Sequence, residues 1–226
     1  MTQEFLLICL LGGIVATDTT AAFQVLVSHP LVGCTVAGLL LRDAQLGLSV
    51  GILLELLWLA EVPVGGVRTN EGNVGALVSA AVLIMLARRM QRPEVLLCGS
   101  LLWGLGVAWA GGWLVRGCRR INTVLLHRAD AFAARGDTRG VSLCHAQAIA
   151  LSFVAGVVLT GFGLLLGTRV LAHVVSMVPP SADRAFALTP AVVLGAGLGA
   201  VCALLLRRKN LWALAVGLFA GLLLLR

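Results

Sequence analysis

The carboxylate of Glu55 is the side chain in this sequence that most clearly demands a chemical explanation. It lies in the segment GILLELLWLA, inside an apolar run over about residues 46–60. A charged side chain at the centre of a membrane span costs about 2.5 to 3.5 kcal/mol, so it faces a bundle interior or a water-filled cavity. We therefore expect Glu55 to belong to a binding or transport site. A purely structural role, paired with a buried arginine or hydrogen-bonded for packing, is the alternative.

A second polar group follows directly, in the loop AEVPVGGVRTNEGNVGAL. Pro63 and several glycines prevent a continuous helix here. A carboxylate accepts hydrogen bonds from two hydroxyls, and an amide both donates and accepts, so this composition suits a sugar. The candidate ligands are Asn70, Glu71 and Asn73, and a solvated connector is the alternative.

Polar residues also precede the break at Pro30, in TDTTAAFQVLVSHPL. Polar groups that flank a broken segment can converge on the cavity that holds Glu55. His29 is the weakest of them, because a histidine at a membrane interface is more often structural. The candidate substrate-binding residues are therefore Asp18, Gln24, His29, Glu55, Asn70, Glu71 and Asn73.

Motifs of the common enzyme classes were sought and are absent from the sequence. It contains no G-x-S-x-G, H-E-x-x-H, P-loop or dinucleotide-binding fingerprint. The six cysteines are scattered singly, without a C-x-x-C pair, which favours a role in apolar packing. We expect no catalytic nucleophile, no metal site and no cofactor in this chain.

The elements that position these residues are expected to be membrane helices. Hydrophobic residues make up 59% of the 226 positions, charged residues only 12%, and the mean hydropathy is +1.00. Soluble domains are about half apolar and a quarter charged. No basic segment precedes the first apolar run, and Asp18 interrupts it before any cleavage pattern, so we interpret this run as a retained membrane segment.

Several apolar runs are too short to cross a bilayer. A span of about 30 Å requires about 20 residues at 1.5 Å each. The runs at about residues 31–41 and 46–60 are shorter than this, and Arg42 and Asp43 separate them. We predict an all-α, polytopic transmembrane helical bundle with broken or re-entrant half-helices, in a single membrane domain over residues 1–226. One tilted, kinked helix with glycine notches is the alternative.

Sixteen arginines and one lysine give the chain a net charge of +7. They lie between hydrophobic runs, where the positive-inside rule accounts for them, so a nucleic acid is not an expected partner. The three basic clusters are at residues 88–92, 116–139 and 207–209. Because the second cluster lies in the longest polar stretch, we place residues 116–145 in the cytoplasm. A single membrane crossing at 95–115 would leave the first cluster on the outer side, in conflict with the positive-inside rule. Glycines that break this run into two half-spans would remove the conflict.

Within that polar stretch, INTVLLHRADAFAARG has helical periodicity. Arg128 and Arg135 lie off the apolar stripe, which predicts an amphipathic helix on the membrane surface. Its basic face would bind anionic lipid headgroups or an acidic soluble partner, and the physics favours lipid. The apolar stripe comprises Ile121, Val124, Leu125, Ala129 and Phe132.

The segment HPLVGCTVAGLLLRDAQLGLSVGILLELLWLAEVPVGGV resembles the IIC membrane component of mannose/fructose/sorbose-type sugar phosphotransferase systems. In that family a proline-containing opening is followed by a Gly-Asp-x-x-x-Gly motif, a glutamate within an apolar segment and a Gly-rich loop. The segment HRADAFAARGDTRGVSLCH resembles the cytoplasmic stretch of the same family. The matching positions are Pro30, Leu31, Cys34, Thr35, Gly38, Asp43, Gly47, Gly51, Glu55, Gly65, Gly66, Asp130, Gly136, Asp137 and His145.

This resemblance implies a permease subunit in the bacterial inner membrane that takes up a hexose or related sugar. It implies an oligomeric complex with the IID membrane subunit, the soluble proteins IIA and IIB, and membrane lipid. IIB would supply the phosphoryl group, so this chain would carry no phosphorylated residue. The resemblance places sugar contacts of the family at Glu55, at Asn70, Glu71 or Asn73 in the following loop, and at Gln24 before the proline. A non-transporting scaffold or sensor derived from the family is the alternative.

Overall fold

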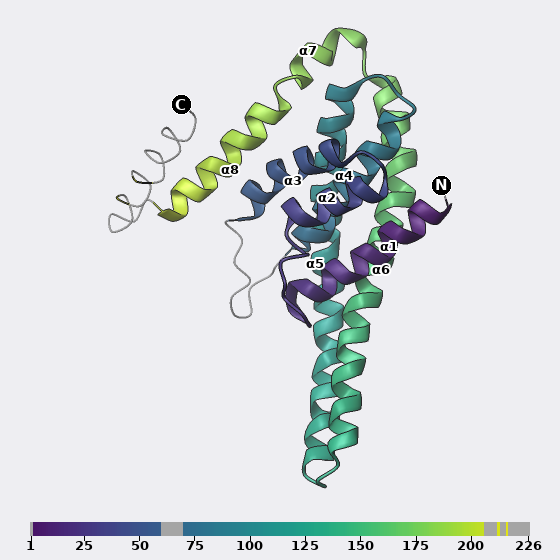
Figure 1. Ribbon diagram of the computed structural model, residues 1–226, viewed down its shortest axis with the longest axis vertical. Coiled ribbons are helices and arrows are strands. Elements are labelled where there is room, and N and C mark those ends of the chain that lie inside the picture. Colours follow the sequence, from purple (N-terminus) through teal and green to yellow (C-terminus); the bar gives the residue numbers. More distant parts are fainter. Residues whose placement is uncertain (1, 60–69, 206–211, 213–215, 217–226) are drawn as a thin grey trace.

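The computed structural model describes residues 2–59, 70–205, 212 and 216. Every regular element in this part of the chain is helical, which confirms the predicted all-α bundle (Figure 1). The Gly65–Gly66 pair and the basic cluster at 207–209 lie outside the described residues. The elements are α1 (Thr2–Thr20), α2 (Pro30–Leu40), α3 (Ala44–Trp58), α4 (Gly72–Ala87), α5 (Pro93–Ala133), α6 (Thr138–Met177), the 3-10 turn η1 (Pro180–Ala182), α7 (Asp183–Phe186) and α8 (Thr189–Leu205).

Four helical segments are long and apolar enough to cross a membrane: α1, α5, α6 and the segment Pro180–Ala203. The 41 residues of α5 extend about 61 Å at 1.5 Å per residue, twice the thickness of the hydrocarbon core. Figure 1 shows α5 and α6 running side by side well beyond the other helices. The distal part of this hairpin therefore projects beyond the rest of the bundle.

The predicted half-helices are present as α2 and α3. With 11 and 15 residues they extend only about 16 and 22 Å. The side chain of Asp43 caps α3 by accepting a hydrogen bond from the Leu46 N–H at 3.1 Å. Glycines let the two backbones touch, because a Cβ on Gly47 would lie 2.4 Å from the Cys34 carbonyl oxygen. The broken segment is thus a tightly packed helical hairpin.

Helix α4 occupies the centre of the bundle. It is buried on all faces, as expected for a helix that is apolar all round, and it packs against α1, α2, α3, α5 and α6. Its closest contact is with α5, where a Cβ on Gly75 would lie 2.5 Å from the Gly104 carbonyl oxygen. Gly104 and Gly111 therefore serve packing, and of the two possibilities left open by the sequence α5 adopts the unbroken helix.

The projecting parts of α5 and α6 pack along a seam. The less exposed positions of α5 recur at spacings of four and three, as in coiled coils: Cys118, Asn122, Leu125, Ala129 and Phe132. Residues 121–133 thus continue α5, and the prediction of a separate helix on the membrane surface is wrong. Leu125, Ala129 and Phe132 of the predicted stripe lie in the seam, whereas Ile121 and Val124 are exposed.

A compact turn closes this hairpin. Gly136 has φ +71°, and the Asp137 N–H donates to the Phe132 carbonyl at 3.0 Å while the Gly136 N–H donates to the Ala133 carbonyl at 2.9 Å. These are the bonds of a Schellman motif. Asp137 then begins α6 by accepting a hydrogen bond from the Gly140 N–H at 3.0 Å. Only four residues separate the helices, so the tip of the hairpin is well defined.

The first arginine cluster is held by specific partners at the opposite end of α5. Arg88 pairs with Glu4 at 3.0 Å and also bonds the Leu41 carbonyl. Arg92 donates to the carbonyls of Val175 and Val178 and pairs with Asp183. Arg88 thus joins the end of α4 to α1 and to the end of α2, and Arg92 joins the start of α5 to the end of α6 and to α7. These contacts explain why basic residues lie at both ends of one unbroken helix.

Candidate functional site

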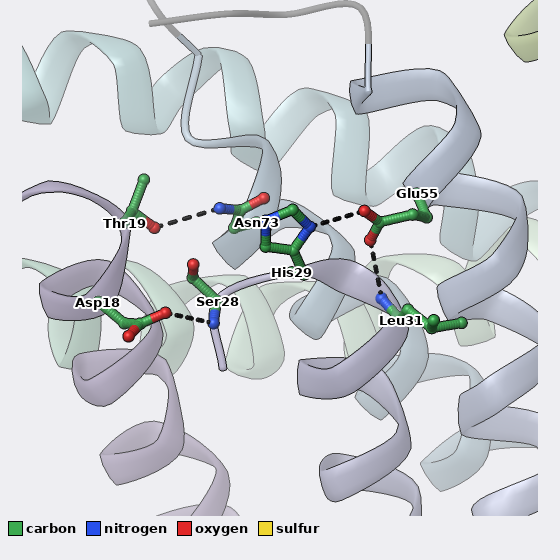
Figure 2. Close-up of polar contacts among 7 residues, drawn as sticks. All are labelled: Asp18, Thr19, Ser28, His29, Leu31, Glu55 and Asn73. Atoms are coloured by element: carbon green, nitrogen blue, oxygen red, sulfur yellow. Dashed lines mark hydrogen bonds and ion pairs between the residues drawn. The ribbon is translucent and has the colours of Figure 1, made fainter. Parts of the chain in front are cut away.

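Successive helices alternate in direction, so their polar ends meet. The end of α1, the start of α2, the end of α3 and the start of α4 all gather beside the middle of α5 and α6. Figure 2 shows the contacts that join the first four of these ends. Polar residues separated by up to 54 positions in the sequence are thereby brought together.

Asp18, at the end of α1, organises the loop that follows it. Asp18 is 3% exposed, and its two carboxylate oxygens accept hydrogen bonds from the Val25 N–H at 2.7 Å and the Ser28 N–H at 2.8 Å. Figure 2 shows the bond to Ser28. The loop needs such anchoring, because Phe23, Gln24 and Leu26 all have positive φ. The carboxylate of Asp18 is thus committed to the protein backbone.

Glu55 joins α3 to the first turn of α2. Its Oε1 lies 2.7 Å from His29 Nδ1, and its Oε2 accepts a hydrogen bond from the Leu31 N–H at 3.1 Å (Figure 2). The side chains of His29 and Glu55 are 45% and 21% exposed. Glu55 therefore satisfies an otherwise unpaired N–H at the start of α2.

Two further contacts tie α4 to its neighbours at this end of the bundle. The Asn73 amide donates to Thr19 Oγ1 at 3.2 Å, which links α4 to α1 (Figure 2). The indole of Trp58 lies against the start of α4, where a Cβ on Gly72 would come within 2.6 Å of it. A bulkier residue than glycine would displace the tryptophan. The start of α4 is thus enclosed by α1 and α3.

A cavity of about 210 Å³ lies at the start of α4, between the end of α1, Trp58 of α3 and the middle of α5 and α6. At about 30 Å³ per water molecule it has room for about seven waters. Its polar lining comprises Thr19, Thr20, Trp58, Asn70, Glu71, Asn73, Cys118, Arg119, Asn122 and Ser152. Its walls thus present amides, hydroxyls, an indole N–H and charges of both signs.

Two lining residues have buried polar atoms without a hydrogen-bond partner among the residues that the structure describes. These atoms are Trp58 Nε1, a donor, and Asn122 Oδ1, an acceptor. A buried polar group without a partner costs about 1–3 kcal/mol. A hydroxyl group is chemically complementary to both atoms, because it accepts as well as donates.

Two features hold Glu71 at the cavity: a backbone hydrogen bond to α5, and a glycine of α5 that leaves room for its side chain. Its N–H donates to the Ala108 carbonyl of α5 at 2.9 Å. A Cβ on Gly111 would lie 2.6 Å from the Glu71 Cβ, so only glycine admits the glutamate here. Arg119 lines the same cavity from the next turns of α5. Among the residues that the structure describes, the cavity is therefore lined by one carboxylate and one guanidinium.

Six of the seven predicted site residues fall into two groups, and Gln24 belongs to neither. Asn70, Glu71 and Asn73 line the cavity. Asp18, His29 and Glu55 do not line it; they bind the segments that surround it. Gln24 is exposed in the loop that Asp18 holds.

Sequence reasoning missed several cavity residues: Trp58, Cys118, Arg119, Asn122 and Ser152. Trp58 reads as part of an apolar run, although it lies one turn after Glu55 on α3. Asn122 could have been singled out in the sequence, because it is the one strongly polar residue among the seam positions of α5. That it lies in this seam, however, is clear only once α5 and α6 are packed together.

Comparisons with known proteins agree with this architecture. Residues 2–225 match the sequence model of the EII-Sor family, described as the sorbose-specific IIC component of the phosphotransferase system. The sorbose-specific EIIC component of Klebsiella pneumoniae is 31% identical over 121 residues, which cover 54% of this chain and 43% of that protein. The fructose permease IIC component of Bacillus subtilis is 28% identical over 121 residues, covering 54% and 42%.

The mannose-specific EIIC component of Escherichia coli K12 is 24% identical over 123 residues, covering 54% of this chain and 44% of that protein. The aligned segment thus spans less than half the length of each of these relatives. Over nearly the whole chain, the fold matches two solved structures at 18% identity. One is described only as a membrane protein (TM-score 0.78, covering 98% of this chain and 87% of that one).

The other is a complex of the mannose transporter ManYZ with microcin E492 (TM-score 0.64, covering 98% and 86%). At this identity the two structures support the fold, and the family match over residues 2–225 supports the identity. The chain is a multi-pass inner-membrane protein, and it belongs to the sorbose-type IIC family, the membrane components of mannose/fructose/sorbose phosphotransferase systems.

Proposed function

We propose that this chain is the permease subunit that forms the sugar-binding part of the translocation path in a mannose-family phosphotransferase system. The sugar occupies the cavity at the start of α4. The observation that carries this proposal is the pair of buried, unpartnered polar atoms on Trp58 and Asn122 in the wall of that cavity. They are complementary to a hydroxylated ligand and not to an apolar one.

The proposed sugar contacts come from α3, from the start of α4 and from α5. Asn70, Glu71 and Asn73 supply amides and a carboxylate from the start of α4, and Asn122 supplies an amide from α5. Trp58 adds an N–H and an indole surface. Glu55, His29 and Asp18 position these groups by fixing α2 and the loop before it.

Transport further requires partners outside this chain. We propose the IID subunit in the membrane, and a soluble IIB protein, charged through IIA, that transfers a phosphoryl group to the incoming sugar. The names of the relatives suggest mannose, fructose and sorbose as the first sugars to test.

The test uses near-isosteric variants that remove one unpartnered atom each. Trp58→Phe and Asn122→Leu should each weaken hexose binding by about tenfold or more, because one hydrogen bond in a buried site is lost. Binding is measured by titration calorimetry on the purified chain. The matched control is Thr160→Val, since Thr160 Oγ1 is also buried and unpartnered but lies against Gly12, outside the cavity. Unchanged affinity in both cavity variants would refute the site.

A further inference from the structure

Beyond Asn122, the distal hairpin of α5 and α6 contributes no residue to the lining of the sugar cavity. We define residues 117–145, the distal part of this hairpin, as the arm. It carries five arginines and two aspartates, and therefore a net positive charge. Its surface also exposes apolar side chains: Ile121 is 50% exposed, Val124 56%, Leu126 59% and Leu143 58%.

An aromatic pair marks where α5 leaves the membrane. Trp109 and Trp113 are 64% and 60% exposed and pack edge to face with ring centroids 6.1 Å apart. The guanidinium of Arg116 lies 3.8 Å above the ring of Trp113. Exposed tryptophans next to an arginine are typical of the interface between bilayer and water. Arg116 therefore lies at the level of the lipid headgroups.

The arginines farther along the arm are beyond the reach of the bilayer. Arg128 lies twelve residues after Arg116, which is about 18 Å along the helix, or about 14 Å at a tilt of 40°. The headgroup region is only about 5–8 Å thick on each side, and the Debye length is about 8 Å at physiological salt. Arg135 and Arg139 lie at the tip, farther still. Lipid headgroups thus do not account for these three charges.

The combination of arginine with exposed apolar side chains is that of a protein interface. Arginine is enriched at binding hot spots, and exposed apolar groups in water favour association with a complementary surface. The net positive charge of the arm selects a partner with an acidic face and attracts it over a distance.

The base of the arm coincides with the sugar cavity. Arg119 and Asn122 belong to the arm and also line the cavity. Arg128 lies only six residues, about 9 Å, beyond Asn122 along α5. A protein bound to the arm would therefore stand next to the cavity and could act on its occupant.

We propose that the arm is the docking surface for a soluble protein that presents an acidic face. The inference rests on the proposed function in one respect, namely that this protein is the phosphoryl-carrying IIB subunit. Docking uses Arg128, Arg135 and Arg139, together with the exposed apolar side chains around them. The sugar contacts in the cavity are not part of the docking surface.

The test measures binding of the purified IIB protein of the same system to the full chain in phosphatidylcholine nanodiscs. The triple variant Arg128→Gln, Arg135→Gln, Arg139→Gln should bind at least about tenfold more weakly and with a smaller salt dependence. The control variant Arg42→Gln, Arg169→Gln, Arg184→Gln removes three exposed charges elsewhere and should bind within about twofold of the unmodified chain. Circular dichroism confirms that both variants retain their helical content.

Three results would overturn the docking surface: no binding of IIB, equal binding to the arm variant, or binding only when phosphatidylglycerol is added to the nanodiscs. Hexose affinity separates this failure from a failure of the proposed function. The arm variant should bind hexose normally, and Asn122→Leu should lose hexose binding but still bind IIB through the arm. If the chain binds IIB in a charge-dependent manner but binds no hexose, the docking surface on the arm is supported and the proposed sugar site is wrong.

Discussion

Nδ1 of His29 and Oε1 of Glu55 lie 2.7 Å apart and connect the first turn of α2 to α3, two helices that are each too short to span the membrane. The second oxygen of Glu55 binds the backbone N–H of Leu31. One carboxylate thus fixes the broken segment at the end where the cavity lies. This geometry makes Glu55 a positioning residue for the site.

A double-mutant cycle with His29→Ala and Glu55→Gln should give a coupling energy of about 1 kcal/mol, a modest value because the pair is partly exposed. Reversible unfolding of the purified chain in detergent provides the measurement. Independent effects of the two substitutions would show that the contact does not stabilise the hairpin. Glu55→Gln should also lower hexose uptake without preventing membrane insertion, and normal uptake would contradict a positioning role.

The close packing of α2 against α3 should make Gly47 intolerant of a side chain. Gly47→Ala places a Cβ 2.4 Å from a backbone carbonyl oxygen, so the two helices must separate. We expect a loss of stability of about 1–3 kcal/mol or more. The control is Gly117→Ala on α5, where nothing lies within 4 Å and alanine favours the helix. Thermal unfolding of both variants measures the difference, and equal melting temperatures would contradict the packing.

The hydrogen bonds of Asp18 should protect two specific backbone amides from exchange. Asp18→Ala removes the acceptor of the Val25 and Ser28 N–H groups. The loss of about 1–3 kcal/mol corresponds to roughly 5- to 150-fold faster hydrogen exchange at these two positions. Exchange followed by mass spectrometry gives the readout, with α4 amides as an internal control. Unchanged exchange in the loop would show that Asp18 does not anchor it.

Features that depend on segment length and composition could be predicted from the sequence. The half-helices follow from apolar runs of insufficient length, and Asn70, Glu71 and Asn73 follow from the composition of one loop. The pairing of His29 with Glu55 could not be predicted, because it depends on the antiparallel register of α2 and α3. That register is set by contacts between Gly38 and Gly47, which the sequence shows only as separate glycines.

The question left open in α5 and the error in it share one physical cause. Glycines make a helix break possible when their neighbours are unknown, but Gly104 and Gly111 are the places where α4 approaches α5. Similarly, the amphipathic pattern of residues 121–133 predicts a surface helix when their packing against α6 is not known. Asn122 becomes a cavity residue for the same reason. Tertiary packing overrides local propensity in both halves of α5.

Cys118 offers the most direct test of the claim that sugar occupies the cavity at the start of α4. It lines that cavity, whereas Cys98, on the same helix, does not. In single-cysteine variants, alkylation by a small maleimide should be slowed about tenfold at Cys118 by hexose at ten times its dissociation constant, since only the free site reacts. Alkylation of Cys98 should not change. Saturable hexose binding that leaves the rate at Cys118 unaltered would contradict the account.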